Sequence, residues 1–144
     1  MSNLRICNEI IKLNSDPPIG ISIFVNEDIY NWDAIIIGPN DSPWEGGIFN
    51  LKINIPIDYP HKAPKIKFLN KMFHPNIYKN GDICIDILQN KWSPVYDIST
   101  ILVSIQSLLT DPNINSPANV EASNLYTNNL KEYNKKIKKM IQEN

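Results

Sequence analysis

Cysteine is rare in this sequence, and the net charge is close to zero. Its 144 residues include two cysteines, Cys7 and Cys84, and its acidic and basic side chains leave a net charge of −1. The cysteines form no CxxC pair and show no Cys/His ligand spacing, so we expect two free thiols, no disulfide framework, no metal and no cofactor. The balanced charge excludes disordered, supercharged and nucleic-acid-coating proteins, and no direct nucleic-acid partner is expected.

Long hydrophobic runs are absent as well. The longest purely apolar run covers residues 34–37, whereas a helix that spans a bilayer needs about 20 such residues. The first ten residues lack the apolar centre of a signal peptide. We therefore expect a protein of the cytoplasm and nucleus without a membrane partner. The length suits one hydrophobic core, so residues 1–144 are expected to form a single, monomeric domain.

The N-terminal residues 2–14 have the pattern of an amphipathic helix, which the "DPP" at 16–18 ends. Apolar and charged residues separate onto two faces: Leu4, Cys7, Ile10 and Ile11 on one, Arg5, Glu9 and Lys12 on the other. On this pattern Cys7 is a small buried hydrophobic residue without a reactive role.

Four strands are predicted next. Residues 48–55 alternate strictly between apolar and polar side chains, which is typical of a half-buried strand. Similar runs occur at 20–26, 30–38 and 65–69, and turn-rich pieces separate them. Neighbouring strands joined by such turns form an antiparallel meander. The sequence therefore predicts one four-stranded sheet with one exposed face.

The remaining residues form a long loop and three helices. Residues 69–96 follow neither the helical nor the strand period, and a loop of this length is more often functional than filler. A strongly apolar helix at 98–109 then packs across the sheet. Ser116 and Pro117 have the types of an N-cap and a first-turn residue, and predict a short helix that ends near Tyr126. A last helix is striped by apolar residues: Leu130, Tyr133, Ile137, Met140 and Ile141.

Cys84 lies in that loop without an obvious activating group. A nucleophilic cysteine usually has a helix N-terminus, a cation or a paired histidine. His74 could act as such a base in a cysteine hydrolase, although the "HPN" at 74–76 fits a rigid turn with a structural imidazole better. A cysteine without a base suits thiol–thioester exchange, which needs access more than activation.

Several ordered pieces of the chain resemble ubiquitin-conjugating enzymes. The pieces are "PPIGIS", "GPNDSPWEGGIF", "YPHKAPKIKF", "HPN", "GDICIDIL", "WSP" and "DPNINSPAN". The family's α+β fold consists of an N-terminal helix, a four-stranded antiparallel meander, a long active-site loop and three C-terminal helices, which matches the order read from periodicity. The pieces "KMFHPNIY", "DILQNKWSPVYD" and "SIQSLL" further resemble the branch that acts in post-replication DNA repair and histone ubiquitination.

The resemblance implies a catalytic set around Cys84, which would carry ubiquitin as a thioester. Asn76 would either donate to the oxyanion formed when a lysine attacks, or hold the loop by bonding backbone. Asp86 would favour a cationic acceptor lysine, or be an exposed loop charge. Ser116 stands where many relatives carry an aspartate, and it would contact the incoming lysine or only cap the helix that Pro117 begins.

The resemblance also implies partners. The polar face of the first helix, with Arg5, Asn8 and Lys12, resembles the surface that meets the ubiquitin-activating enzyme, and a solvated face would look the same. A patch of three residues resembles the site for RING-type ligases: His61, Pro94 and Val95. Ser22 marks the opposite face of the sheet, where the family can bind a second ubiquitin.

Three readings compete with ubiquitin transfer to substrate lysines. A catalytically silent ubiquitin-positioning variant would lack the cysteine, which this chain keeps. A conjugating enzyme for another ubiquitin-like modifier is the second, although the chain has no insertion between Cys84 and Trp92 of the kind found in the enzyme for SUMO. A hydrolase built on Cys84 and His74 is the third, and it lacks an orienting carboxylate for the histidine.

Overall fold

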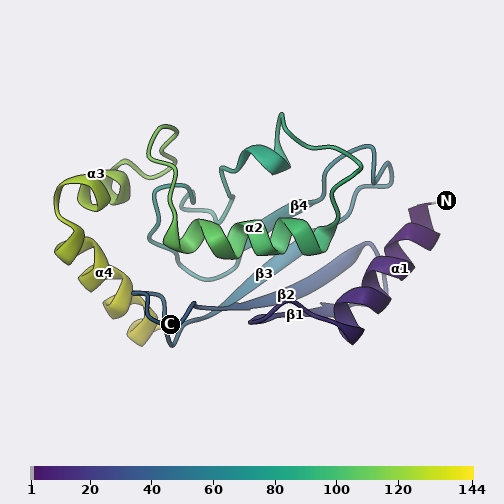
Figure 1. Ribbon diagram of the computed structural model, residues 1–144, viewed down its shortest axis with the longest axis horizontal. Helices are drawn as coiled ribbons and strands as arrows, with labels where there is room; N and C mark the ends of the chain where they lie inside the picture. The colour runs from purple at the N-terminus through teal and green to yellow at the C-terminus, as the bar shows by residue number, and fades with distance from the viewer. Residues whose placement is uncertain (1) are drawn as a thin grey trace.

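The computed structural model describes residues 2–144, and the side chains from residue 3 onward. The elements follow the predicted order (Figure 1): α1 (Ser2–Ser15), β1 (Ile21–Val25), β2 (Asn31–Ile37), β3 (Ile48–Asn54), β4 (Lys65–Phe68), the 3-10 helix η1 (Asp86–Leu88), α2 (Ile98–Thr110), α3 (Val120–Asn128) and α4 (Leu130–Glu143). The α+β fold class predicted from the sequence is therefore confirmed. The longest helices have 14 residues, and among residues 2–144 no helix could cross a membrane.

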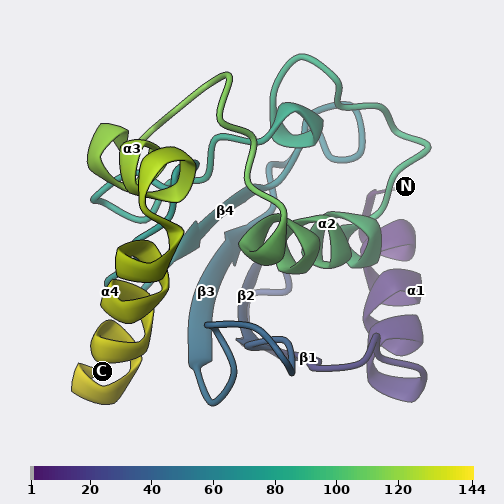
Figure 2. The ribbon, with the colours of Figure 1, turned by 60° about the vertical axis from the view of Figure 1, so that its left-hand side comes forward.

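The four strands form one antiparallel sheet in the order β1-β2-β3-β4. Its register pairs Ile36 with Phe49 and Ala34 with Leu51, so buried side chains of neighbouring strands lie opposite one another. The helix α2 runs across one face of this sheet, with α1 at one end and α3 and α4 at the other (Figures 1 and 2). Apolar residues of α2 fill the space against the strands: Ile98, Ile101, Leu102, Ile105 and Leu109 are buried.

The buried face of α1 differs from the prediction. Leu4 and Ile11 are 66% and 64% exposed, and Cys7 is exposed, whereas Glu9 is 8% exposed. The carboxylate of Glu9 accepts hydrogen bonds from the Tyr59 hydroxyl at 2.6 Å and from the backbone N–H of Ile98 at 2.8 Å. These donors compensate the burial of a charge, so a polar residue takes the inward position that the apolar pattern gave to Cys7. The prediction of a buried Cys7 and an outward Glu9 was wrong.

The start of α3 also differs from the prediction. Its N-cap is Asn119, whose side chain accepts a hydrogen bond from the backbone N–H of Ala122 at 3.1 Å. Ser116 lies in the preceding loop and is exposed. The backbone N–H groups of Ala118 and Asn119 donate to the Pro75 carbonyl at 2.7 and 3.0 Å, so this segment is bonded to the "HPN" loop and not to a helical turn. The prediction that Ser116 caps this helix was wrong.

Candidate active site

His74, a residue of the long loop, is fully buried and uses both of its ring nitrogens. Nε2 donates to the backbone carbonyl of Leu108 at 2.7 Å, and Nδ1 accepts from the backbone N–H of Asn76 at 2.9 Å. Burial lowers the pKa of His74 to about 4, so the ring is neutral at physiological pH. A buried, fully bonded imidazole has no lone pair for a nucleophile. Of the two roles considered for His74, this geometry supports the structural one.

Asn76 is equally buried, and every polar group of its amide is engaged. Its Nδ2 donates to the carbonyls of Asn113 at 2.7 Å and Ser116 at 3.2 Å. Its Oδ1 accepts from the backbone N–H of Asn113 at 2.8 Å. Its own backbone carbonyl accepts from the N–H of Cys84 at 2.8 Å. Asn76 therefore ties the cysteine segment to the 113–116 loop, and in this arrangement its amide has no free donor.

Cys84 is partly exposed and opens into a hollow of about 280 Å³. The residues that line this hollow are Cys84, Ile85, Asp86, Gln89, Asn90, Leu108, Asn113 and Ser116. None of these carries a positive charge or an imidazole. The cysteine thus has access from solvent and a polar, largely amide-rich environment, but no lining residue that could act as its base. This is the environment expected for thioester exchange and not for a histidine-activated hydrolase.

Asp86 and Ser116 share this hollow with the cysteine. The backbone is extended at Ile85 (φ −138°, ψ 134°), and Asp86 then begins η1, the short turn of helix above α2 in Figures 1 and 2. Asp86 and Ser116 are both exposed. The structure therefore brings three of the four predicted catalytic residues together around one opening and places Asn76 directly beneath it.

Comparison with known proteins identifies the family. The family model described as "Ubiquitin-conjugating enzyme" matches residues 5–141. Ubiquitin-conjugating enzyme E2 2 of Neurospora crassa is 50% identical over 96% of this chain and 92% of its own length. Ubiquitin-conjugating enzyme E2 3 of Arabidopsis thaliana is 49% identical over 96% and 93%, and E2 2 of Mycosarcoma maydis is 51% identical over 98% and 77%.

The chain belongs to the ubiquitin-conjugating enzyme family. Its relatives are enzymes of ubiquitin transfer by name, and the chain is accordingly a ubiquitin transferase. The resemblance seen in the sequence motifs is thereby confirmed at the level of the family.

The predicted contact surface for the activating enzyme is only partly free in this family member. Arg5 donates to the backbone carbonyls of Pro94 at 2.7 Å and Tyr96 at 2.5 Å, and its guanidinium lies 5.3 Å from the centre of the Tyr59 ring. Arg5 thus holds the 94–96 loop against α1. Asn8 is exposed, and Lys12 is exposed with its Nζ 3.4 Å from the carboxylate of Asp97.

The patch predicted for RING-type ligases consists of exposed residues on two adjacent loops. His61 and Pro94 are exposed, and Val95 is 83% exposed. Trp92 joins the two loops, because its indole N–H donates to the Pro60 carbonyl at 2.9 Å. The loop that carries Val95 is therefore bonded, through Trp92, to the loop that carries His61.

Two residues of the structural site were not singled out in the sequence. Glu9 pairs with Arg5 four residues earlier at 3.1 Å, but the Tyr59 and Ile98 donors that compensate its burial are 50 and 89 residues away, so no local pattern indicated that it faces inward. Asn113 belongs to the piece "DPNINSPAN", which carried part of the family resemblance, and its place in that piece was a usable signal.

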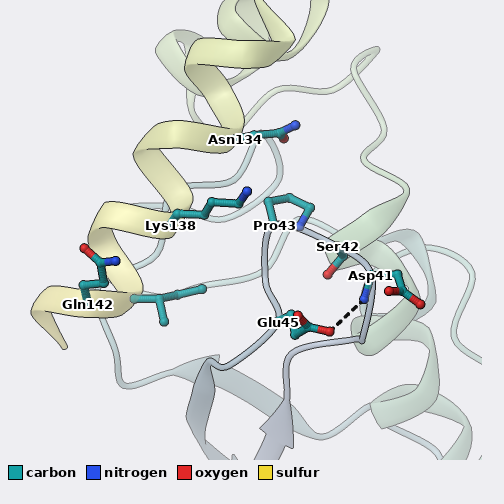
Figure 3. Close-up of a pocket in the computed structure, with 8 residues that line it drawn as sticks. Asp41, Ser42, Pro43, Glu45, Asn134, Lys138 and Gln142 are labelled. Carbon is teal, nitrogen blue, oxygen red and sulfur yellow. Dashed lines mark hydrogen bonds between the residues drawn. The ribbon is translucent and has the colours of Figure 1, made fainter.

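A second hollow, between the 41–45 loop and α4, has a volume of about 520 Å³. Figure 3 shows Asn134, Lys138 and Gln142 on the helical wall and Pro43 and Glu45 on the loop, where the Asp41 N–H donates to Glu45 at 3.1 Å. The hydroxyl of Ser42 donates to the Pro39 carbonyl at 2.6 Å. This hollow is lined by neither cysteine nor histidine, so it offers no nucleophile for acyl transfer.

Proposed function

We propose that this enzyme accepts activated ubiquitin as a thioester on Cys84 and transfers it to substrate lysines. The observation that carries the proposal is the placement of an accessible thiol in a hollow without a base, above a fully hydrogen-bonded frame made by His74 and Asn76. A transfer between sulfur atoms is near balance in energy and needs no strong base. A rigid frame suits a reaction in which geometry is the main contribution of the protein.

Loading exchanges one thioester for another. The Cys84 thiol gives its proton to solvent, and the thiolate attacks the C-terminal carbonyl carbon of ubiquitin held on the activating enzyme. The new C–S bond forms, the old C–S bond breaks, and the activating enzyme's thiolate leaves. In discharge the neutral Nε of an acceptor lysine attacks the same carbonyl, the C–S bond breaks, and the Cys84 thiolate leaves. The amine nitrogen then loses a proton to solvent as the isopeptide bond forms.

Asp86 and Ser116 face the path of the acceptor lysine in this proposal. A lysine with an ordinary pKa of about 10.4 is about one part in a thousand neutral at neutral pH. The Asp86 carboxylate attracts the incoming cationic side chain into the hollow. The Ser116 hydroxyl, which lines the same hollow, offers a hydrogen bond but no charge.

The surfaces on either side of the cysteine suit the family's other partners. We propose that the α1 face with Asn8 and Lys12, together with Arg5, meets the ubiquitin-activating enzyme, and that His61, Pro94 and Val95 receive a RING-type ligase. The sequence pieces shared with the post-replication-repair and histone-ubiquitinating branch support a role in that branch, in the cytoplasm and nucleus. A single domain that acts as a monomer completes the proposal.

The proposal is tested by incubating the protein with ubiquitin, an activating enzyme and ATP and running a non-reducing gel. A band at the summed mass of the two proteins that disappears with reductant is the expected thioester. If the protein yields no such band with an activating enzyme that loads a control conjugating enzyme, the proposal is wrong.

A further inference from the structure

Discharge of a thioester creates an oxyanion that needs a hydrogen-bond donor. When the amine adds to the carbonyl carbon, the carbonyl electron pair moves onto oxygen, and pre-positioned donors stabilise that charge in the transition state. The amide of Asn76 donates to the carbonyls of Asn113 and Ser116, so it is not available for this role without breaking those bonds. The other groups that line the hollow beside Cys84 are therefore the candidates for this donor.

Asn113 is an exposed residue at the edge of that hollow. It lines the same hollow as Cys84. Its Oδ1 accepts from the backbone N–H of Asn115 at 3.0 Å, which fixes the plane of the amide and assigns its oxygen. Its Nδ2 has no hydrogen-bond partner among residues 2–144. A fixed amide with a free NH₂ group is a donor that costs little reorganisation during reaction.

The backbone of Asn113 is held as firmly as its side chain. Its N–H donates to Asn76 Oδ1 at 2.8 Å, and its carbonyl accepts from Asn76 Nδ2 at 2.7 Å. The buried amide of Asn76 thus forms hydrogen bonds with the peptide groups on both sides of the Asn113 side chain. Substitution of Asn76 would remove both hydrogen bonds to the Asn113 backbone. A slower discharge in an Asn76 variant can therefore result from displacement of Asn113.

The other polar groups of the hollow are not oriented in this way. The side chains of Gln89 and Asn90 are exposed, as is that of Asn113. Within the described part of the chain, however, no hydrogen bond orients the amides of Gln89 and Asn90. The contact between Asn76 and Ser116 involves the Ser116 carbonyl and not its hydroxyl. Asn113 is therefore the lining residue whose donor is both free and fixed.

We infer that Asn113 is a catalytic residue that donates a hydrogen bond from Nδ2 to the oxyanion formed during discharge of the Cys84 thioester, and that Asn76 is the positioning residue that holds Asn113 in place. The inference rests on the proposed function of Cys84. It assigns the oxyanion donor to a different asparagine from the one that the sequence motif suggested.

The step conserves atoms and charge with groups already named. The attacking nitrogen bonds to the carbonyl carbon, the oxygen takes the negative charge next to Asn113 Nδ2, and the intermediate collapses as the C–S bond breaks. The Cys84 thiolate departs and the nitrogen gives one proton to solvent. Asn113 neither gains nor loses a proton.

The test is single-turnover discharge of purified thioester to hydroxylamine and, separately, to free lysine. Hydroxylamine is neutral at neutral pH, so its rate reports oxyanion stabilisation without the pKa of an acceptor lysine. Asn113→Asp keeps an oxygen that can accept from Asn115 but loses the NH₂ group, and Asn113→Ala loses both. Asn90→Asp adds the same negative charge in the same hollow and is the matched control.

Both Asn113 variants are expected to load normally and to discharge to hydroxylamine roughly 10- to 100-fold more slowly, since loss of one oxyanion donor costs about 100-fold or more in a well-studied protease. With hydroxylamine, which carries no charge for a carboxylate to attract, Asn90→Asp is expected to stay within about twofold of wild type, because Asn90 is not the donor. Discharge of Asn113→Asp to hydroxylamine at the wild-type rate would overturn the inference. A wild-type protein that forms no thioester at all would instead overturn the proposed function, and the inference with it.

A double variant tests the role of Asn76. If Asn76 acts by holding Asn113, Asn76→Ala combined with Asn113→Ala should lose about as much rate as the more severe single variant, because residues that act as a unit are not additive. Losses that multiply would show that the two asparagines act separately, which contradicts the positioning role. Circular dichroism of each variant confirms that the fold is retained.

Discussion

Cys84 and Cys7 are both accessible to solvent: Cys84 opens into a hollow lined by other polar groups, and Cys7 is exposed on α1. Cys84→Ser is expected to accept ubiquitin as an oxyester that forms more slowly and survives reductant, because an alkoxide is a poorer leaving group than a thiolate. Cys7→Ser, on the outer face of α1, is expected to load at the wild-type rate. Reducing and non-reducing gels of the two variants measure this difference.

The adducts formed by these two variants show which cysteine is the nucleophile. Loss of the adduct in Cys7→Ser together with its retention as a reducible thioester in Cys84→Ser would contradict the assignment of the site.

Ser116 is exposed, lines the hollow and does not cap a helix. Its substitution should therefore change the rate of discharge without changing the stability of the fold. Ser116→Asp is expected to raise discharge to free lysine several-fold, because a carboxylate beside the ammonium attracts the acceptor, while Ser116→Ala discharges no faster than wild type. Neither change should alter the melting temperature by more than about 1–2 °C, since exposed substitutions without a structural bond have small effects. Single-turnover rates between about pH 7 and 9, with thermal melts in parallel, measure both quantities.

A phosphate on Ser116, which precedes a proline, would place about −1.5 to −2 charges at the same wall. Equal discharge rates for wild type, Ser116→Asp and Ser116→Ala across the pH range would remove Ser116 from the catalytic set.

Among the elements, α3 shows how a local contact decides where a helix starts. Asn119 caps it through the N–H of Ala122, and acidic Glu121 lies in its first turn. Asn119→Ala is expected to lower the free energy of unfolding by about 1 kcal/mol, the usual effect of losing such a cap, whereas Asn119→Ser retains most of it. Urea denaturation of both variants provides the measurement. A larger loss for Ser116→Ala than for Asn119→Ala would return the cap to Ser116.

The strands and the helix α2 could be predicted closely from the sequence because each depends on a repeating pattern of its own residues. Residues 48–55 alternate strictly, and the observed β3 covers 48–54 with the same residues inward. The inward face of α1 could not be predicted, because its apolar pattern is incomplete and Glu9 is buried by donors on distant segments. The periodicity of a helix contains no information about a hydrogen bond to a residue far along the chain.

The residues of the candidate active site could be predicted from the sequence, but their hydrogen-bond partners could not. The family resemblance named four residues: Cys84, Asn76, Asp86 and Ser116. The structure places Cys84, Asp86 and Ser116 around one opening. Asn76 is buried and does not line it. The engagement of the Asn76 amide could not be predicted, since its partners at 113 and 116 are brought beside it only by the complete fold. The roles of these residues in catalysis stay predictions.

On the scale of the whole molecule, the long loop is bonded to the region after α2 at several points. His74 forms a hydrogen bond with the carbonyl of Leu108. The Pro75 carbonyl accepts hydrogen bonds from the N–H groups of residues 118 and 119. The Asn76 amide forms hydrogen bonds with residues 113 and 116. These bonds join segments more than 30 residues apart. The hollow beside Cys84 is therefore as stable as the contact between these segments, and we expect a change that weakens the contact to affect both folding and discharge.

Protonation of His74 is such a change, and it makes global stability depend on pH. Burial lowers the pKa of His74 in the folded protein to about 4, below the ordinary value of 6.5, because the charged ring is desolvated. Between these values the unfolded chain binds a proton that the folded chain does not, so stability is fully present above about pH 6.5 and falls as the pH drops toward about 4. From about pH 7 to pH 5 the expected loss is about 2 kcal/mol.

This loss can be measured by urea denaturation at the two pH values, and its cause can be isolated by substitution. Asp97 does not contribute in this range: burial alone would raise its pKa, but hydrogen bonds from Thr100 and the nearby Lys12 hold it below its usual value of 3.8. His74→Gln, which cannot take up the proton, should be less stable at neutral pH but should lose little further stability on acidification. His61→Gln, at the protein's exposed second histidine, is the matched control and should keep the wild-type dependence. A His74→Gln protein that loses as much stability as wild type between the two pH values would show that other groups cause the acid sensitivity.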